Sequence, residues 1–320
     1  MIYVITNNHT KYLVDIREVL GVNLDDENKF QEKYEYCIER KMLKENTSLH
    51  QNMRDSVAVL ETALDKFKHI FPTYTDHSII HSENVLQLCN ALLKERIHLL
   101  NVDECYILAM SCYLHDVGMC ITEADYQEFL SQIETDNYLE EYPDATLADI
   151  VRTFHNEFSG CFIKKYSDFF EIPTKEHVWG IIQVSRGHRK TDLFDRSEYP
   201  DIILENGNVL HLQCLAAIIR LADELDVTVE RNSPLLYEKL ILIDSKDIGA
   251  FSLHEAIRGI NIYDDRIVLR INAQGALLKS VENLCEKIRE TMNYCSEASK
   301  YGDARLLPQM QLVLDNLNTF

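Results

Sequence analysis

Apolar residues recur at the spacing of amphipathic helices through most of residues 51–230. A repeat of about 3.6 residues buries one face of a helix and leaves the other in water, so the pattern predicts a helical bundle. Turn-forming residues in FPTYTD, EYPDAT, EIPTK and LENGN separate the helical segments. The clearest predicted helices cover residues 55–70, 81–96, 103–116, 147–166, 175–188 and 209–227.

The two ends of the chain follow other patterns. The N-terminal part predicts a short strand at IYVI (2–5) and a charged helix around 27–44. After Pro234, β-branched residues alternate in 238–244, 258–263 and 265–273, which is typical of strands. Helices are expected again at 277–300 and around 306–317. We therefore predict a mainly α fold in three parts: an N-terminal segment (1–50), a helical bundle (51–235) and a small α/β C-terminal extension (236–320).

Composition narrows the class of protein. The 320 residues carry a formal net charge of −20, which repels phosphate backbones and anionic lipid and so disfavours broad nucleic-acid or membrane binding. The nine cysteines include no Cys-x-x-Cys pair and indicate reduced thiols. The first residues lack the pattern of a signal peptide, and no apolar run approaches the roughly 18 residues of a membrane span. These features predict a cytoplasmic protein with no membrane partner.

Candidate metal ligands lie on the predicted helices or at their ends. MSCYLHDVGMC (110–120) closes a buried helix with two titratable residues. A lone histidine on a helix is more often a hydrogen-bonded structural residue than a ligand. An aspartate near a helix C-terminus opposes the helix dipole, so between apolar neighbours it calls for a cation. The set in chain order is His81, His115, Asp116, His155, His188 and Asp223.

Imidazole nitrogens with a few carboxylates suit a divalent transition metal better than calcium. Helices can converge such side chains inside a bundle. We therefore expect one or two ions of manganese, iron, nickel, cobalt or zinc, with magnesium as a further option.

The order H…HD…H…H…D, with HSENV, YLHDVGM and IIRLADELDV around it, resembles the HD superfamily of metal-dependent phosphohydrolases. The resemblance covers about residues 70–230. It implies an all-α HD domain with a metal bound by His81, His115, Asp116 and Asp223. His155 and His188 match the two further histidines of the binuclear branches. HEAIRGINIYDD resembles the C-terminal extension of a bacterial HD subgroup, often joined to chaperone-type ATPase modules.

Several branch motifs are absent from the sequence. His188 is followed by RKTDLF and not by Gly-Tyr-Pro, which argues against cyclic-di-GMP hydrolysis. The PFGH continuation of the dNTP triphosphohydrolases and the acidic residues of the alarmone hydrolases are also missing. Met119 replaces the lysine that follows HD-x-G in some branches. The subclass therefore stays open.

In this interpretation Asp116 and His115 are the catalytic residues, and Asp116 bridges two ions. His81, His115 and Asp223 complete the first site, while His155 and His188 hold the second ion.

Further residues are expected around this centre. Arg186, Arg189 and Lys190 are candidates to bind substrate phosphates, the alternative being a solvated loop. His77 is expected behind the ligands, and Asp226 is a weaker competitor of Asp223.

Three functions fit this pattern. The first is a phosphohydrolase or phosphodiesterase that acts on a nucleotide, a cyclic nucleotide or another phosphorylated small molecule through metal-activated water. The second is a metal-dependent nuclease on single-stranded nucleic acid, which the net charge disfavours. The third is a module that binds a nucleotide without turnover. A homo-oligomer or a chaperone-type ATPase partner is compatible with each of them.

Overall fold

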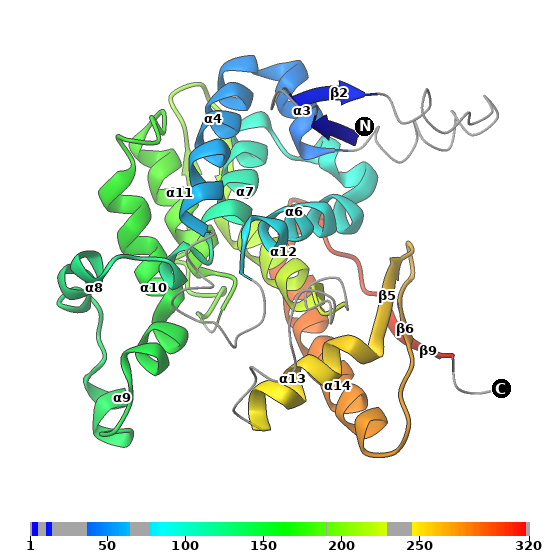
Figure 1. The fold of residues 1–320 in the computed structure, drawn as a ribbon. Coiled ribbons are helices and arrows are strands. Elements are labelled where there is room, and N and C mark those ends of the chain that lie inside the picture. Colours follow the sequence, from blue (N-terminus) through cyan, green and yellow to red (C-terminus); the bar gives the residue numbers. More distant parts are fainter. Residues whose placement is uncertain are drawn as a thin grey trace.

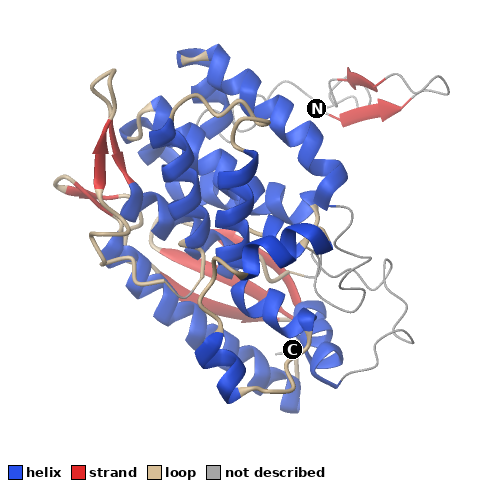
Figure 2. Cartoon of the chain, turned by 90° about the vertical axis from the view of Figure 1, so that its left-hand side faces the viewer, coloured by secondary structure: helices blue, strands red, loops and turns tan. Residues whose placement is uncertain are grey.

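The structure is a computed structural model that describes residues 2–5, 11–14, 37–64, 77–189, 191–228 and 245–317. It is mainly helical with small sheets (Figure 2). The helices in the bundle and its N-terminal flank are α3 (Ile38–Glu45), α4 (Thr47–Leu64), α6 (Ile79–Leu93), α7 (Val102–Leu114), α8 (Glu123–Leu130), α9 (Asp136–Glu141), α10 (Leu147–Tyr166), α11 (Lys175–Arg186) and α12 (Leu212–Leu225), with short 3-10 helices η2 (Lys94–Leu99) and η3 (Val117–Met119).

Helix α7 is the central element of the bundle. Every residue from Asp103 to Leu114 is buried, so this helix has no solvent-facing side. A capping box begins it: the Asn101 side chain accepts from the Glu104 backbone N–H, and the Glu104 carboxylate accepts from the Asn101 backbone N–H. An apolar helix surrounded by others is what a bundle core requires.

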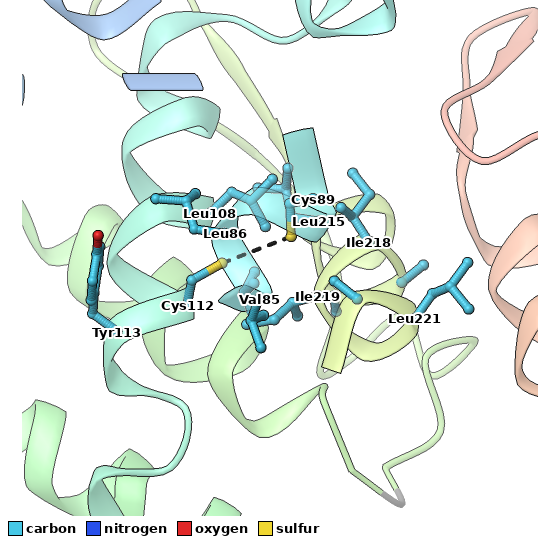
Figure 3. Packing of buried hydrophobic residues seen from close by; sticks show 14 of the residues in the cluster. Val85, Leu86, Cys89, Leu108, Cys112, Tyr113, Leu215, Ile218, Ile219 and Leu221 are labelled. Carbon is cyan, nitrogen blue, oxygen red and sulfur yellow. Dashed lines mark hydrogen bonds between the residues drawn. The ribbon is translucent and has the colours of Figure 1, made fainter. Parts of the chain in front are cut away.

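The core between α6, α7 and α12 fixes the positions of three helices that matter for the site. Figure 3 shows Leu108 and Cys112 of α7 beside Val85 and Cys89 of α6, with Ile219 of α12 nearby. All five side chains are fully buried. Close packing of this kind leaves little freedom for the helix ends, so polar residues placed there are held firmly.

The C-terminal part forms a small α/β unit beside the bundle (Figure 1). It contains α13 (Ser245–Ala256), β5 (Ile257–Ile262), β6 (Arg266–Ile271), α14 (Gly275–Ala298) and β9 (Gln311–Asn316). The sheet order is β5-β6-β9; β5 and β6 are antiparallel, while β6 and β9 are parallel in the register Arg266↔Gln311 to Ile271↔Asn316. Helix α14 is the crossover that a parallel pair needs.

The mainly α fold with a small α/β C-terminal part is confirmed. The strand at 2–5 is confirmed as β1 (Ile2–Ile5), which pairs with β2 (Lys11–Val14). Strands β5 and β6 and helix α14 lie where the pattern predicts them. Of the helix predicted at 27–44, residues 27–36 lie outside the described residues, as does the strand predicted at 238–244.

The helix predicted around 306–317 is wrong, because residues 311–316 form strand β9. Pro308 precedes this run, and Leu312 and Leu314 face the interior while Val313 and Asp315 alternate with them. A short apolar run carries both the helical and the strand period, and pairing with β6 decides between them.

Two short hairpins are also absent from the prediction. They pair β3 (Asp201–Ile203) with β4 (Val209–His211) and β7 (Lys300–Tyr301) with β8 (Ala304–Arg305). Strand β4 occupies the first turn of the helix predicted at 209–227, so α12 begins at Leu212.

The division into 1–50, 51–235 and 236–320 stays a prediction. Its first boundary falls inside α4, and its second lies among residues 229–244, outside the described part. Within the described ranges, no single helix has the length and apolar composition to cross a membrane. Two segments that meet at a bend of 95°, Val102–Met119 and Glu123–Leu130, have that length and composition only when they are taken together.

Candidate metal centre

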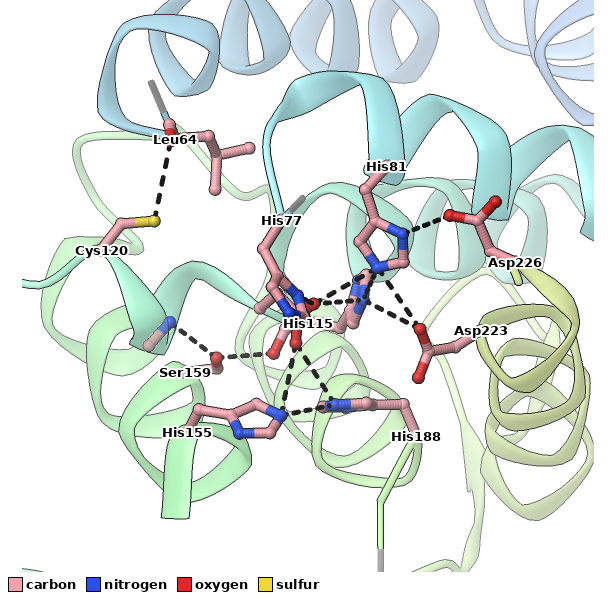
Figure 4. Close-up of polar contacts among 12 residues, drawn as sticks. Leu64, His77, His81, His115, Cys120, His155, Ser159, His188, Asp223 and Asp226 are labelled. Atoms are coloured by element: carbon pink, nitrogen blue, oxygen red, sulfur yellow. Dashed lines mark hydrogen bonds and ion pairs between the residues drawn. The ribbon is translucent and has the colours of Figure 1, made fainter. Parts of the chain in front are cut away.

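Six side chains from five helices converge inside the bundle (Figure 4). His81 lies in the first turn of α6, after the Ser78 cap. His115 is the C-cap of α7, and Asp116 follows it with φ −104° and ψ 4°, where the chain leaves the helix. The others are His155 in the middle of α10, His188 just after α11, and Asp223 in the last turn of α12. These are the six ligands that the sequence predicts, and the structure brings all of them together.

The first group of donor atoms surrounds the Nε2 atom of His81. That atom lies 3.2 Å from Nε2 of His115, 3.3 Å from Oδ2 of Asp116 and 3.3 Å from Oδ1 of Asp223. Nε2 of His115 lies 3.2 Å from the same Asp116 oxygen. Two donors bound to one ion at about 2.0–2.1 Å stand roughly 2.9–3.4 Å apart in octahedral to tetrahedral geometry. These four spacings fit one divalent ion, while the spacing between Nε2 of His115 and Oδ1 of Asp223, 3.9 Å, is longer.

The second group lies on the other side of Asp116. Its Oδ1 atom is 3.4 Å from Nε2 of His155 and 3.4 Å from Nε2 of His188, and the two nitrogens are 3.0 Å apart. The two oxygens of Asp116 thus face different groups. A carboxylate in this position can bridge two ions.

The outer nitrogens of the four histidines fix the direction of the inner ones. Nδ1 of His115 lies 2.9 Å from the carbonyl oxygen of Cys112, and Nδ1 of His155 lies 2.7 Å from that of Arg152. His188 repeats this contact, three residues back, with Ser185 at 2.5 Å. A carbonyl oxygen only accepts, so each of these Nδ1 atoms carries the proton. The Nε2 side of each ring then faces the centre, where its lone pair can bind a cation.

His81 reaches the same state through a carboxylate. Its Nδ1 lies 2.6 Å from Oδ2 of Asp226, and this carboxylate oxygen accepts a hydrogen bond from the Nδ1–H. Acceptors behind metal-binding histidines set the tautomer and raise ligand basicity. Asp226, predicted as a competitor of Asp223, therefore lies behind the ligand His81 instead.

Lone pairs facing one another make the donor set suitable for a cation. Burial lowers the pKa of His155 to about 3 and lowers that of His188 as well, so both rings are neutral near pH 7. Two neutral Nε2 acceptors 3.0 Å apart, next to a carboxylate oxygen, repel one another. A divalent ion between them attracts both nitrogens and the carboxylate oxygen and so offsets this repulsion. The residues present therefore fit one or two transition-metal ions.

The carboxylates stay ionised in this environment. Burial alone raises the pKa of Asp116, but His115 and His77 together hold it well below its usual range. Burial likewise raises the pKa of Asp223, but the contact with His81 and the nearby His115 together hold that pKa well below its usual range. Both groups are thus available as anionic ligands over the whole neutral range.

The turn that carries His115 and Asp116 is tied to α10. Ser159 donates from Oγ to the carbonyl oxygen of His115 at 2.6 Å and accepts from the N–H of Gly118 at 2.9 Å. Gly118 is required by close approach: a Cβ there would lie 2.2 Å from the backbone oxygen of His155. No sequence motif singles out Ser159, although it lies one helical turn after His155.

His77 touches the centre directly. Its Nδ1 lies 2.6 Å from Oδ2 of Asp116, and its side chain is 17% exposed. His77, His81 and Asp116 form a third cluster of donor atoms close enough to hold an ion. The sequence pattern predicts His77 behind the ligands, and the structure puts it beside the Asp116 carboxylate.

The three predicted phosphate-binding residues have different surroundings. Arg186 donates to Glu157 (2.9 and 3.1 Å), to Glu198 (3.1 Å) and to Gln183 (2.6 Å), so its guanidinium is already held by protein acceptors. Arg189 is exposed, and its charge acts on His155. Lys190 lies outside the described residues.

Comparison with known proteins gives one match. A family model described as HD-CE matches residues 71–295, more than two thirds of the chain. The matched range contains all six converging side chains and runs well into the C-terminal part. Among the curated proteins and the solved structures, none matches the chain.

Proposed function

The chain belongs to the HD-CE family, and on that premise we propose that it is a metal-dependent hydrolase of small phosphate esters. An HD-type domain with a His/Asp cluster that could hold metal supports a metal-dependent HD hydrolase in general. The phosphate ester as the substrate class is our proposal. It rests on the sequence resemblance and on the chemistry of the donor set.

One observation carries the proposal: the two oxygens of Asp116 face two separate groups of imidazole nitrogens. His81, His115, Asp223 and Asp116 Oδ2 would hold one ion. His155, His188 and Asp116 Oδ1 would hold the other. When bound, such a pair supplies a water of lowered pKa and neutralises charge on phosphoryl oxygens.

The protein residues keep this arrangement ready for the reaction. The carbonyls of Cys112, Arg152 and Ser185 hold the rings of His115, His155 and His188 in the tautomer that binds a cation. His77 hydrogen-bonds Oδ2 of Asp116 and so restricts rotation of the bridging carboxylate. A preorganised donor set of this kind needs no rearrangement when the ester arrives.

Arg189 is the residue that we propose for a substrate phosphate. It is exposed and follows His188 directly, and its guanidinium makes no hydrogen bond or ion pair with the described residues. A guanidinium binds phosphate oxygens through two parallel donors. Arg186 is a poorer candidate because Glu157 and Glu198 neutralise it. Lys190 stays a prediction.

A nucleotide or another phosphorylated small molecule suits the charge of the chain better than a long nucleic acid. The net charge of −20 repels an extended phosphate backbone, whereas a single ester needs only one local cation. We therefore propose a small-molecule phosphohydrolase or phosphodiesterase. Cleavage of single-stranded nucleic acid is an outcome that the experiment below separates.

The test screens metal-free protein reloaded with Mn²⁺, Zn²⁺, Fe²⁺, Ni²⁺, Co²⁺ or Mg²⁺. The substrates are phosphomonoesters, nucleotides, cyclic nucleotides, single-stranded DNA and RNA. Hydrolysis of a small ester that Asp116→Ala abolishes and the exposed Asp201→Ala retains supports the proposal. Binding without turnover would instead indicate a sensing module, and cleavage confined to DNA or RNA would indicate a nuclease.

A further inference from the structure

Helix α12 presents three residues on one side toward the metal centre. Ala216, Arg220 and Asp223 are spaced i, i+4 and i+7, which places them on one face of a helix. Asp223 belongs to the first donor group. Ala216 meets Gly187, where an added Cβ would lie only 2.5 Å from its methyl carbon. The helix therefore contacts both halves of the centre, since Gly187 directly precedes His188.

Arg220 fastens the chain on both sides of His188. Its Nε donates to the carbonyl oxygen of Gly187 at 2.7 Å. Its Nη2 donates to the carbonyl oxygen of Thr191 at 2.7 Å and to the Thr191 hydroxyl at 3.1 Å. A guanidinium is planar and rigid, so these bonds fix the two backbone positions relative to each other.

Tyr294 of α14 contacts Arg220 and the two residues that follow Thr191. The guanidinium carbon of Arg220 lies 5.2 Å from the centre of its ring, within the range of a cation–π contact. The Tyr294 hydroxyl accepts from the N–H of Leu193 at 2.8 Å and donates to Oδ1 of Asp192 at 3.1 Å. Helix α14 packs against α12 (Figure 1). A side chain of the C-terminal unit thus contacts the segment that carries His188.

We propose that Arg220 and Tyr294 are positioning residues that hold His188 at the second half of the metal centre, so that the C-terminal unit controls occupancy of that half. The inference rests on the two-ion centre of the proposed function. His188 depends on such support because it follows the end of α11 and lies outside any helix. His155, its partner at 3.0 Å, is fixed within α10.

The test measures binding of Mn²⁺ to metal-free protein by equilibrium dialysis and metal analysis. Arg220→Met keeps the length of the side chain and removes its donors. Tyr294→Phe removes only the hydroxyl. The control is Arg196→Met: Arg196 joins the same stretch of chain to the first turn of α12, through Gln213 at 2.9 Å, without contacting the residues next to His188.

We expect Arg220→Met to weaken the second equivalent of Mn²⁺ about tenfold and to leave the first unchanged, since partners behind a metal ligand typically contribute 10–100-fold in affinity. Tyr294→Phe should weaken the same equivalent by a smaller factor. Arg220→Lys should restore part of the loss, because one donor returns. Arg196→Met should bind both equivalents like the wild type.

A purely structural role for Arg220 would lower the thermal midpoint and affect both equivalents alike, and that result overturns the inference. If Arg220→Met does not fold, Tyr294→Phe decides, and wild-type binding in that variant overturns it too. A wild type that holds fewer than two ions also overturns it. A wild type that holds two ions but hydrolyses no phosphate ester contradicts the proposed function only, because ion counting needs no turnover.

Discussion

Ser159→Ala tests how strongly the turn that carries His115 and Asp116 is tied to α10. The Ser159 hydroxyl is fully buried and makes two hydrogen bonds, to the His115 carbonyl at 2.6 Å and from the Gly118 N–H at 2.9 Å. Alanine leaves both backbone groups buried without this partner. Each such group costs about 1–3 kcal/mol, so the free energy of unfolding should fall by roughly 2–6 kcal/mol. That is a large part of the stability of an ordinary domain.

The assay is urea unfolding of the metal-free protein, which separates stability from metal binding. Ser280→Ala is the matched control, because Ser280 is an exposed serine in α14 whose hydroxyl bonds the carbonyl four residues earlier at 3.2 Å. A surface change of this kind should alter the unfolding free energy by less than about 0.5 kcal/mol. If Ser159→Ala costs no more than Ser280→Ala, the turn does not depend on this serine and the reasoning is refuted.

Two further predictions concern a glycine and a histidine. Gly118→Ala should destabilise the protein and weaken metal binding, because the added methyl would meet backbone atoms of α10. Gly249→Ala in α13, where nothing lies within 4 Å of the added Cβ, should instead stabilise the protein by up to about 1 kcal/mol. Unfolding of both variants in urea checks this. The hydrogen bond to buried Glu104 is the main reason why the pKa of His211 is raised. The contribution of protonated His211 to the unfolding free energy is therefore complete below about pH 6.5 and is lost as pH rises through the raised pKa. The unfolding free energy measured across this range should fall with rising pH in the wild type and fall less in His211→Asn; equal slopes would contradict the assignment.

The sequence predicts the convergence of the candidate ligands because their helices are unambiguous and long. It could not place Asp226, which is only three residues after Asp223. The reason is that α12 ends at Leu225, so the backbone of Asp226 is no longer helical and its side chain turns toward His81. The route of the chain beyond a helix end depends on tertiary packing.

Arg186 shows the same limit for charged residues. Its position beside His188 suggests a phosphate contact, but Glu157 lies 29 residues earlier on α10 and meets it only in the folded bundle. An ion pair between side chains on two different helices leaves no pattern in the local sequence. The helix predicted over strand β9 is wrong for a related reason: pairing with β6, which is distant in the sequence, makes the segment of Leu312 and Leu314 a strand.

We propose that the Asp116 carboxylate joins two metal sites. The most direct test is an anomalous difference map from crystals of the protein grown with Mn²⁺. We predict two peaks, one beside Oδ2 of Asp116 among His81, His115 and Asp223, and one beside Oδ1 between His155 and His188. A map with fewer than two peaks in contact with Asp116, from crystals with Mn²⁺ in excess, would contradict this assignment.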